Sequence, residues 1–198
     1  TTQDWGDCQV EGGTVVDIDE KSHWAIDVYD NAMFVISLGY MIDFEDNPDD
    51  KKKWTELREN IRQNIREHLW DENNSKFIPH VYLDGSPFPD DFNENATHFH
   101  GGTAIAIEAG ILTNEEILTV YRQMLENVRL SGAPTIGLTL YPPYPDGIIE
   151  GSTTCKPYIY QNGGDWTWFG GRMVQQLVEN GYEKEAYEAI RPMLDRVI

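Results

Sequence analysis

Apolar and polar positions along the chain follow two alternating patterns, and each pattern predicts a helix. Residues 25–42 and 101–112 are apolar or small nearly all round, which is typical of buried helices. Residues 50–69 instead keep their apolar residues on one stripe and their charges elsewhere, as a surface helix lying on a core does. Thr113 and Glu116 offer a capping box that opens a second surface helix. Buried and surface helices are therefore expected in pairs.

A third pair is predicted near the C-terminal end of the chain. Asp165 occupies an N-cap position and opens a helix that runs to Glu179, where Asn180-Gly181 ends it. A helical pattern then resumes at Tyr182 and continues to the end of the chain. Within it, Pro192 predicts either a kink or a later helix start.

A long loop rich in aromatic residues, Asp, Asn, His, Gly and Pro precedes each buried helix, over residues 1–24, 70–100 and 131–164. Within these loops, residues 76–83 and 139–141 could form short strands. Loops of this length in a compact domain are usually functional, and their positions should gather them at one end of the buried helices. We expect one all-α domain over residues 1–198, built from three repeats of loop, buried helix, turn and surface helix.

The segment from Tyr158 to Phe169 carries five aromatic residues around a tight Asn-Gly-Gly turn. Aromatic rings can cover the apolar face of a sugar, while carboxylates and amides bind its hydroxyls. For each residue alone, a capped helix with aromatic core packing is the alternative interpretation. The residues of this segment expected at a sugar are Tyr160, Gln161, Asn162, Asp165, Trp166 and Trp168.

Composition narrows the class of partner. A formal net charge of −19 argues against nucleic acid and against an anionic membrane, and it agrees better with a neutral substrate. The sequence shows no apolar run long enough for a membrane span and no signal peptide, so we expect a soluble protein and leave cytoplasm and periplasm open. Cys8 and Cys155 are the only cysteines, and a single bridge between them stays open.

Three short motifs stand in the predicted loops and at a buried-helix start: residues 4–7 (Asp-Trp-Gly-Asp), 27–34 (Asp-Val-Tyr-Asp-Asn-Ala-Met-Phe) and 160–166 (Tyr-Gln-Asn-Gly-Gly-Asp-Trp). The last resembles the Tyr-His-Asn-Gly-Gly-Ser-Trp element of neutral and alkaline invertases, and the second is placed like their Val-Asp-Ser-Gly-Leu-Trp segment. The first resembles loops that carry the general acid in trehalases and processing glucosidases. Together with the helix pattern, they resemble six-hairpin glycoside hydrolases, including bacterial amylo-glucosidase-like enzymes.

The resemblance implies an (α/α)6 toroid, of which this chain shows three hairpins. The chain begins without a methionine and ends within a helical pattern, so we expect it to be roughly the C-terminal half of such a domain. The remaining hairpins would come from the same domain or from another chain.

Glycosidic bond cleavage needs a general acid and an opposing base or nucleophile. Trp5 between Asp4 and Asp7 would supply the apolar surroundings and the neighbouring charge that keep a carboxyl protonated near neutral pH. A surface loop with two solvated acids is the alternative. We expect Asp7 to be the acid and Asp4 a ligand for a hydroxyl. Asp165 is expected near the reacting sugar, with the base there or beyond Ile198.

The start of the first buried helix also carries polar groups. Asp27, Asp30 and Asn31 share one face of an otherwise apolar helix and need partners. Asp30 is expected either to hold sugar hydroxyls or to cap a neighbouring loop. Trp24 and Tyr29 would then be platforms for a sugar ring, with core packing as the alternative for each.

The remaining polar candidates do not suggest a metal. His98 and His100 alternate as on a strand without a third ligand nearby, so hydrogen bonds to substrate or loops are expected instead of zinc binding. Glu150 is a candidate base or a surface acid. The acidic run at residues 43–50 does not match an EF-hand and predicts a solvated linker with charge at a helix start. No metal and no cofactor are expected.

We therefore expect a glycoside hydrolase that acts on an α-glucoside or a related oligosaccharide through two carboxylates. A carbohydrate-binding or scaffold toroid without a complete catalytic pair is the alternative. A phosphorylase is a third possibility, although no basic cluster marks a phosphate site. The isolated 198-residue chain is expected to bind sugar weakly and to lack turnover.

Overall fold

The computed structural model describes residue 20, residues 23–149 and residues 155–196 of the chain. This part is mostly helical with a few short strands, which confirms the coarse form of the predicted fold. Its α-helices are α1 (Val28–Phe44), α2 (Pro48–Leu69), α3 (His100–Glu108), α4 (Asn114–Ser131), α5 (Thr167–Glu179) and α6 (Glu183–Asp195). Its other elements are β1 (Ala25–Asp27), β2 (Trp70–Asp71), β3 (Lys76–Phe77), β4 (His80–Tyr82), the 3-10 helix η1 (Glu94–Ala96), β5 (His98–Phe99) and β6 (Leu140–Tyr141).

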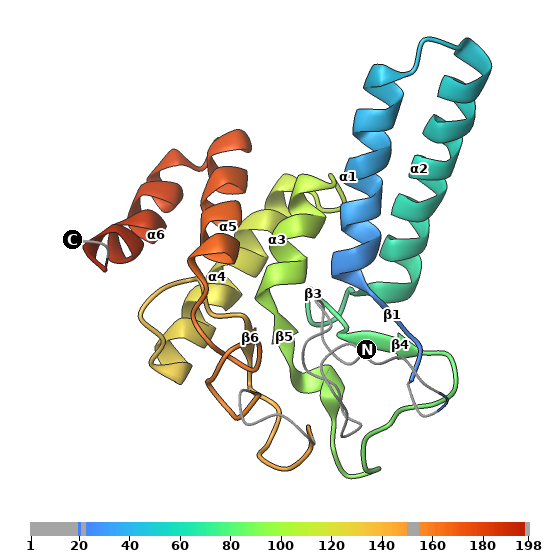
Figure 1. Ribbon diagram of the computed structural model, residues 1–198. Helices are drawn as coiled ribbons and strands as arrows, with labels where there is room; N and C mark the ends of the chain where they lie inside the picture. Colours follow the sequence, from blue (N-terminus) through green and yellow to red (C-terminus); the bar gives the residue numbers. More distant parts are fainter. Residues whose placement is uncertain (1–19, 21–22, 150–154, 197–198) are drawn as a thin grey trace.

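The helices α1, α3 and α5 lie side by side and run in the same direction (Figure 1). Helix α3 packs against both of its neighbours, while α2 and α6 pack against α1 and α5 as their hairpin partners. The N-terminal ends of α1, α3 and α5 all point to the lower edge of the view, where the loops and short strands lie (Figure 1). One end of the helices thus carries the loop residues.

Two hydrophobic clusters hold this arrangement together. The larger one is formed by buried apolar residues from all six helices named above, such as Val35 of α1, Ile105 of α3 and Leu177 of α5. The second lies among the loops around Tyr144 and Phe99. Because the loops bury apolar side chains of their own, they form a packed layer at the helix ends.

The surface helices begin where the sequence places their caps. Asn47 caps α2 by accepting hydrogen bonds from the backbone N–H groups of Asp49 and Asp50, at 2.9 and 3.3 Å. Thr113 and Glu116 form the predicted capping box at the start of α4. These signals are local, so the sequence alone reveals them.

The buried helices depart from the predicted boundaries. Residues 25–27 form β1 and pair with β4, Ala25 opposite Tyr82 and Asp27 opposite His80, so α1 begins only at Val28. Helix α3 ends at Glu108, short of the predicted residue 112. The strands predicted within residues 76–83 and 139–141 are confirmed by β3, β4 and β6.

The N-cap prediction for Asp165 is wrong. Helix α5 begins at Thr167 after Trp166, and no side chain caps it. The Asp165 carboxylate is occupied by partners distant in sequence, as described below. The later start offered for the last helix is also wrong, because α6 begins at Glu183 and continues through Pro192.

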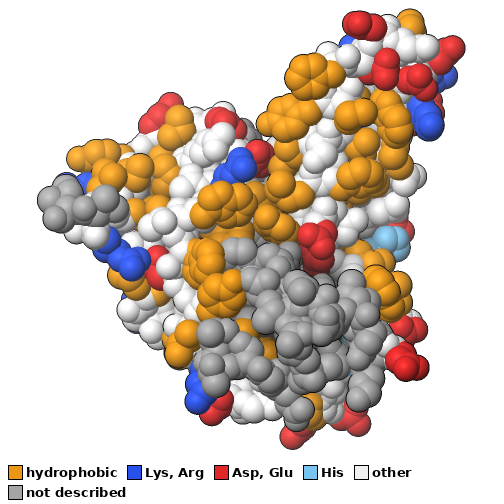
Figure 2. All heavy atoms as spheres, in the orientation of Figure 1, with side chains coloured by type: hydrophobic (Ala, Val, Ile, Leu, Met, Phe, Trp, Pro, Cys, Tyr) orange, Lys and Arg blue, Asp and Glu red, His pale blue; other side chains and the backbone are white. Residues whose placement is uncertain are grey.

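Helix α1 leaves an apolar stripe exposed. Phe34, Tyr40, Met41 and Phe44 are about half exposed or more, and Phe44 reaches 84%. Figure 2 shows hydrophobic side chains gathered over the α1–α2 hairpin on this face. Within the part of the chain that the structure describes, no helix is both long and apolar enough to cross a membrane.

Candidate functional site

Three aromatic rings join the N-terminal ends of α1, α3 and α5. Tyr29, in the first turn of α1, lies 6.1 Å from Phe169 and 6.5 Å from Trp168 of α5, measured between ring centroids. At the start of α3, Gly101 makes room for the Phe169 ring, because a Cβ there would lie 2.6 Å from it. The structure thus brings together Tyr29 and Trp168, two of the predicted sugar contacts.

Trp168 is the exposed member of this cluster, at 44%. The guanidinium carbon of Arg172 lies 5.2 Å from the Trp168 ring centroid, and Arg172 also forms an ion pair with Glu108 at 2.8 Å. These contacts fix the orientation of the indole while part of it stays open to solvent. A ring held in this way can serve as a contact surface for an apolar face of a ligand.

A carboxyl pair lies in the same first turn of α1. Asp27 is 4% exposed, and its Oδ1 accepts a hydrogen bond from the backbone N–H of Asp30 at 2.7 Å, so Asp27 caps the helix. Burial first, and then the negative charge of Asp30, raise the pKa of Asp27 to about 6. The cap uses only Oδ1, which leaves Oδ2 as the oxygen that can carry a proton.

Behind Asp27 lies a buried polar cluster centred on Glu94. Its Oε1 accepts hydrogen bonds from the hydroxyl groups of Tyr82, at 3.0 Å, and Tyr144, and it lies 2.7 Å from Nδ1 of His80. His80 and Glu94 are both buried. The Tyr82 and Tyr144 hydroxyls hold the Glu94 carboxyl in place, and Glu94 in turn orients the His80 ring.

The Asn-Gly-Gly loop is built around Asn162. Its side chain accepts a hydrogen bond from Tyr144 N at 2.7 Å and donates to the carbonyls of Tyr144 and Cys155. These bonds give Asn162 a structural role in holding two loops together. Gln161 differs, because its Oε1 is buried and has no hydrogen-bond partner in the structure, although the side chain is only 1% exposed.

The other aromatic residues predicted at the site are not part of the Tyr29 cluster. The rings of Tyr160 and Trp166 are 5.2 Å apart, and the Trp166 indole donates to the Tyr160 carbonyl at 3.1 Å. This pair stabilises the turn. Trp24 precedes β1 and is 56% exposed, so its ring is available at the surface.

Asp165 is tied to the opposite side of α5. Its carboxylate accepts hydrogen bonds from the backbone N–H of Thr135 at 2.9 Å and from the Thr135 hydroxyl, and it pairs with Arg196 at 2.8 Å. Each carboxylate oxygen is therefore in use. These bonds connect the loop after α4 with the end of α6, which is a structural role.

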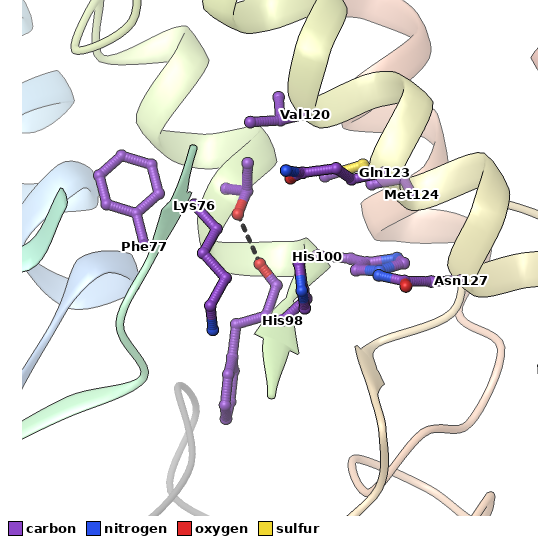
Figure 3. Close-up of a pocket in the computed structure, with 10 residues that line it drawn as sticks. Lys76, Phe77, His98, His100, Val120, Gln123, Met124 and Asn127 are labelled. Carbon is purple, nitrogen blue, oxygen red and sulfur yellow. Dashed lines mark hydrogen bonds between the residues drawn. The ribbon is translucent and has the colours of Figure 1, made fainter. Parts of the chain in front are cut away.

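His98 and His100 lie in a separate buried pocket with Lys76 (Figure 3). The cavity is about 10 Å³, which is room for one water molecule. His100 reaches toward α4, where its Nε2 lies 3.0 Å from Nδ2 of Asn127, while Lys76 donates to the Thr97 carbonyl at 2.7 Å. The two histidines therefore lie between α3 and its partner helix and bind no part of the aromatic cluster.

Burial dominates the electrostatics of this pocket. It lowers the pKa of Lys76 to about 8, of His98 to about 4 and of His100 to about 3. Both imidazoles are thus neutral at pH 7. Among the described residues, no group of three or more His, Cys, Asp or Glu side chains is placed to hold a metal ion.

Several sequence candidates lie outside the described residues: Asp4, Trp5, Asp7, Cys8 and Glu150. The roles predicted for Asp7 as acid, Asp4 as hydroxyl ligand and Glu150 as base therefore stay predictions. Cys155 is part of a disulfide.

Sequence reasoning missed the most perturbed carboxyl. Asp27 was noted for sharing a face with Asp30, yet Asp30 was taken as the ligand. An Asp directly before an apolar helix was the available signal. His80 and Glu94 gave no signal, because their link to Asp27 arises only when β4 pairs with β1.

Comparison with known proteins gives no assignment. No protein family matches the sequence, and no curated protein shows significant similarity to it.

Proposed function

We propose that this protein is a glycoside hydrolase acting on an α-glucoside or a related oligosaccharide. One observation carries the proposal: the first turn of α1 carries a buried carboxyl, whose pKa is raised to about 6, next to an aromatic cluster. A protonated carboxyl is the group that a glycosidic leaving oxygen requires. Aromatic rings are the surfaces on which sugar rings stack.

The exposed groups suit a sugar substrate. Trp168 and Trp24 present open ring surface, and Asp30 presents a carboxylate to solvent beside Asp27. Gln161 adds a buried amide oxygen that lacks a partner, and a ligand hydroxyl could satisfy it. A net charge of −19 agrees with a neutral ligand.

The general acid has two candidates. Asp27 has the burial and the raised pKa that the role demands. Asp7 is the candidate that the sequence provides. Asp27 and Asp30 cannot serve as the opposing pair, because both stand in one helical turn, whereas a base must act from the other face of the sugar. The second carboxylate therefore comes from elsewhere.

The finer architecture that we propose is part of an (α/α)6 toroid. Three helices that run side by side with their loops at one end support it. The exposed apolar stripe on α1 fits a helix flank that a further hairpin would cover. That hairpin would come from the same domain or another chain.

A carbohydrate-binding or scaffold role is the second candidate, and Asp165 favours it. The carboxylate that was expected near the reacting sugar is occupied by Thr135 and Arg196. Among the described residues, this leaves no acid in place opposite Asp27. A binding protein needs only the aromatic surface and the hydroxyl ligands.

Sugar binding separates these roles from an unrelated function. Calorimetric titration with maltose, trehalose and sucrose should detect binding, and Trp168→Ala should weaken it about fivefold, because losing a stacked ring costs about 1 kcal/mol. Tyr187→Ala is the matched control, since Tyr187 is an exposed aromatic on α6, away from the cluster. Equal affinity in wild type and Trp168→Ala would remove the aromatic site from the proposal.

Hydrolysis then tests catalysis. In the intact enzyme, loss of the acid by Asp27→Asn or Asp7→Asn should reduce turnover of poor leaving groups about 10²- to 10⁴-fold and that of activated aryl glucosides less. The variant with this difference identifies the acid. Sugar binding without turnover of any glucoside by the intact protein would favour the binding role.

A further inference from the structure

His80 stands directly opposite Asp27 in the antiparallel pairing of β1 with β4. Residues that face each other in such a pair project their side chains to the same side of the sheet, about 5 Å apart at Cβ. The His80 imidazole therefore lies beside the Asp27 carboxyl at the end of β1, where α1 begins. The pairing of Asp27 with His80 joins the site described above to the buried cluster around Glu94.

Glu94 determines how the His80 ring is oriented. The Nδ1 atom of His80 lies 2.7 Å from Glu94 Oε1, which the hydroxyls of Tyr82 and Tyr144 also reach. With Nδ1 donating to this carboxylate, the second ring nitrogen must point away from Glu94. An acidic side chain that binds one nitrogen of a histidine selects the tautomer and favours the protonated ring.

The second ring nitrogen of His80, Nε2, has no carboxylate or other group bound to it in the described part of the structure. Nε2 is buried and has no hydrogen-bond partner in the structure, although the side chain is only 1% exposed. An unpaired buried nitrogen costs stability, so a fold that retains one usually has another use for it. The Asp27 carboxyl lies opposite this ring in the strand pairing, and the His80 charge is one of the causes that lower its pKa.

We infer that His80, held in place by Glu94, is a positioning residue that controls whether Asp27 carries its proton. When the imidazole is protonated, its positive charge favours the ionised form of Asp27. When the imidazole is neutral, the burial of Asp27 and the charge of Asp30 favour the protonated carboxyl. The consequence for hydrolysis depends on the proposed function, whereas the coupling between the two side chains does not.

The charged and titratable groups around this pair come from four segments. Asp30 on α1 acts against ionisation of Asp27, and His80 on β4 acts for it. Tyr82 on β4, Glu94 on η1 and Tyr144 in the following loop act on His80 through the hydrogen bonds to Glu94. The direction in which the pKa of Asp27 changes when one of these side chains is removed can therefore be stated in advance.

Carbon-13 NMR titration of the Asp27 carboxyl measures the coupling without any need for activity. The resonance is identified by its loss in Asp27→Asn. In His80→Gln, the pKa of Asp27 should rise above its value of about 6, because the side chain whose charge lowers it has been removed. The control His68→Gln removes an exposed histidine on α2 and should leave this pKa unchanged.

A double variant tests whether Glu94 acts through His80. Glu94→Gln removes the carboxylate that holds Nδ1 of His80, so the pKa of Asp27 should rise there as well. In His80→Gln/Glu94→Gln, it should equal the value in His80→Gln alone, because coupled residues do not add. An unchanged pKa in His80→Gln, or additive effects in the double variant, would overturn the inference.

Tyr144→Phe covers the case in which His80→Gln does not fold, as judged by amide NMR spectra. It removes a single hydroxyl donor from Glu94, which holds His80, and it should change the pKa of Asp27 by a smaller amount than His80→Gln does. No change in Tyr144→Phe would count against the inference.

Turnover separates this inference from the proposed function. If the intact protein hydrolyses glucosides, the alkaline limb of its pH profile should move upward in His80→Gln and stay in place in His68→Gln. A shifted Asp27 titration without hydrolysis would refute the proposed function and keep the coupling. Hydrolysis together with an unshifted Asp27 titration would keep the proposed function and refute the coupling.

Discussion

His100 is an imidazole that the fold keeps neutral. It is 2% exposed at the start of α3, and burial together with the neighbouring His98 lowers its pKa to about 3. The unfolded chain protonates the same ring near its ordinary value of about 6.5. Between these two values the unfolded state binds more protons than the folded state, so stability decreases as the pH falls.

Acid should therefore destabilise the wild-type protein more than His100→Gln. Between pH 7 and pH 4.5, the free energy of unfolding should fall by about 2 kcal/mol more in the wild type. Over about two pH units below 6.5, the unfolded chain binds a proton at this position and the folded chain does not. Urea denaturation at both pH values measures the difference. His68→Gln, which changes an exposed histidine, should follow the wild type, and identical pH dependence in His100→Gln would contradict the neutral ring.

At the level of elements, α4 depends on its capping box. The Thr113 hydroxyl accepts a hydrogen bond from Glu116 N, and the Glu116 carboxylate accepts one from Thr113 N at 2.8 Å while pairing with Arg66 of α2. Thr113→Ala should lower the free energy of unfolding by about 1 kcal/mol, because a backbone donor loses its partner. Denaturant unfolding checks this value.

Thr119→Ala is the matched control for the capping experiment. Thr119 is in the same helix and donates its hydroxyl to the Glu115 carbonyl, a bond that does not cap the helix. Since Ala is the better helix former, this change should be neutral or slightly stabilising. Equal losses in both variants would show that the cap has no special contribution.

The elements that could be predicted from the sequence are those whose signals are local. Helices α2 and α4 carry an apolar stripe and a cap within a few residues; α4 begins where expected, and α2 begins at Pro48, two residues before the predicted start. The start of α1 could not be predicted, since Ala25–Asp27 pairs with His80–Tyr82 across more than fifty intervening residues. The true partners of Asp165 are likewise distant, because Thr135 and Arg196 lie thirty or more residues away.

In the candidate site, too, features with a local sequence signal could be predicted, and features that depend on distant residues could not. Tyr29 and Trp168 could be proposed as sugar contacts because aromatic residues cluster at helix starts, and the structure places them together. The orientation of His100 toward Asn127 could not be foreseen, since an alternating pattern does not say which neighbour a strand end faces. The cluster of His80, Glu94 and Tyr144 requires two loops, residues 70–100 and 131–164, to meet.

On the scale of the whole molecule, burial along the α1–α2 hairpin is uneven. The buried residues of α1 are Val28, Ala32, Val35 and Leu38, and those of α2 are Ile65 and Leu69. Apart from Leu38, just past the middle of α1, they lie in the half of the hairpin nearest the loops, and the other half extends past α3 (Figure 1). Local stability should therefore decrease from the base of the hairpin to its tip.

Amide hydrogen exchange can measure this gradient. Residues 40–52 at the tip should exchange through local opening, with lower protection than residues 28–36 and 62–69 at the base. The gradient should remain when the protein is stabilised by mild conditions that suppress global unfolding. Uniform protection along both helices would show that the hairpin opens only as a unit.

The same uneven burial insulates the site from the hairpin's fluctuations. Asp27 and Tyr29 stand at the anchored end of α1, where the helix is fixed by the core and by β4. Bending at the far end must be absorbed by the intervening turns before it reaches them. Motion of the hairpin tip, whether from heat or from collisions with other molecules, therefore decreases along the helices toward the base. The spacing between the Asp27 carboxyl and the aromatic rings stays constant.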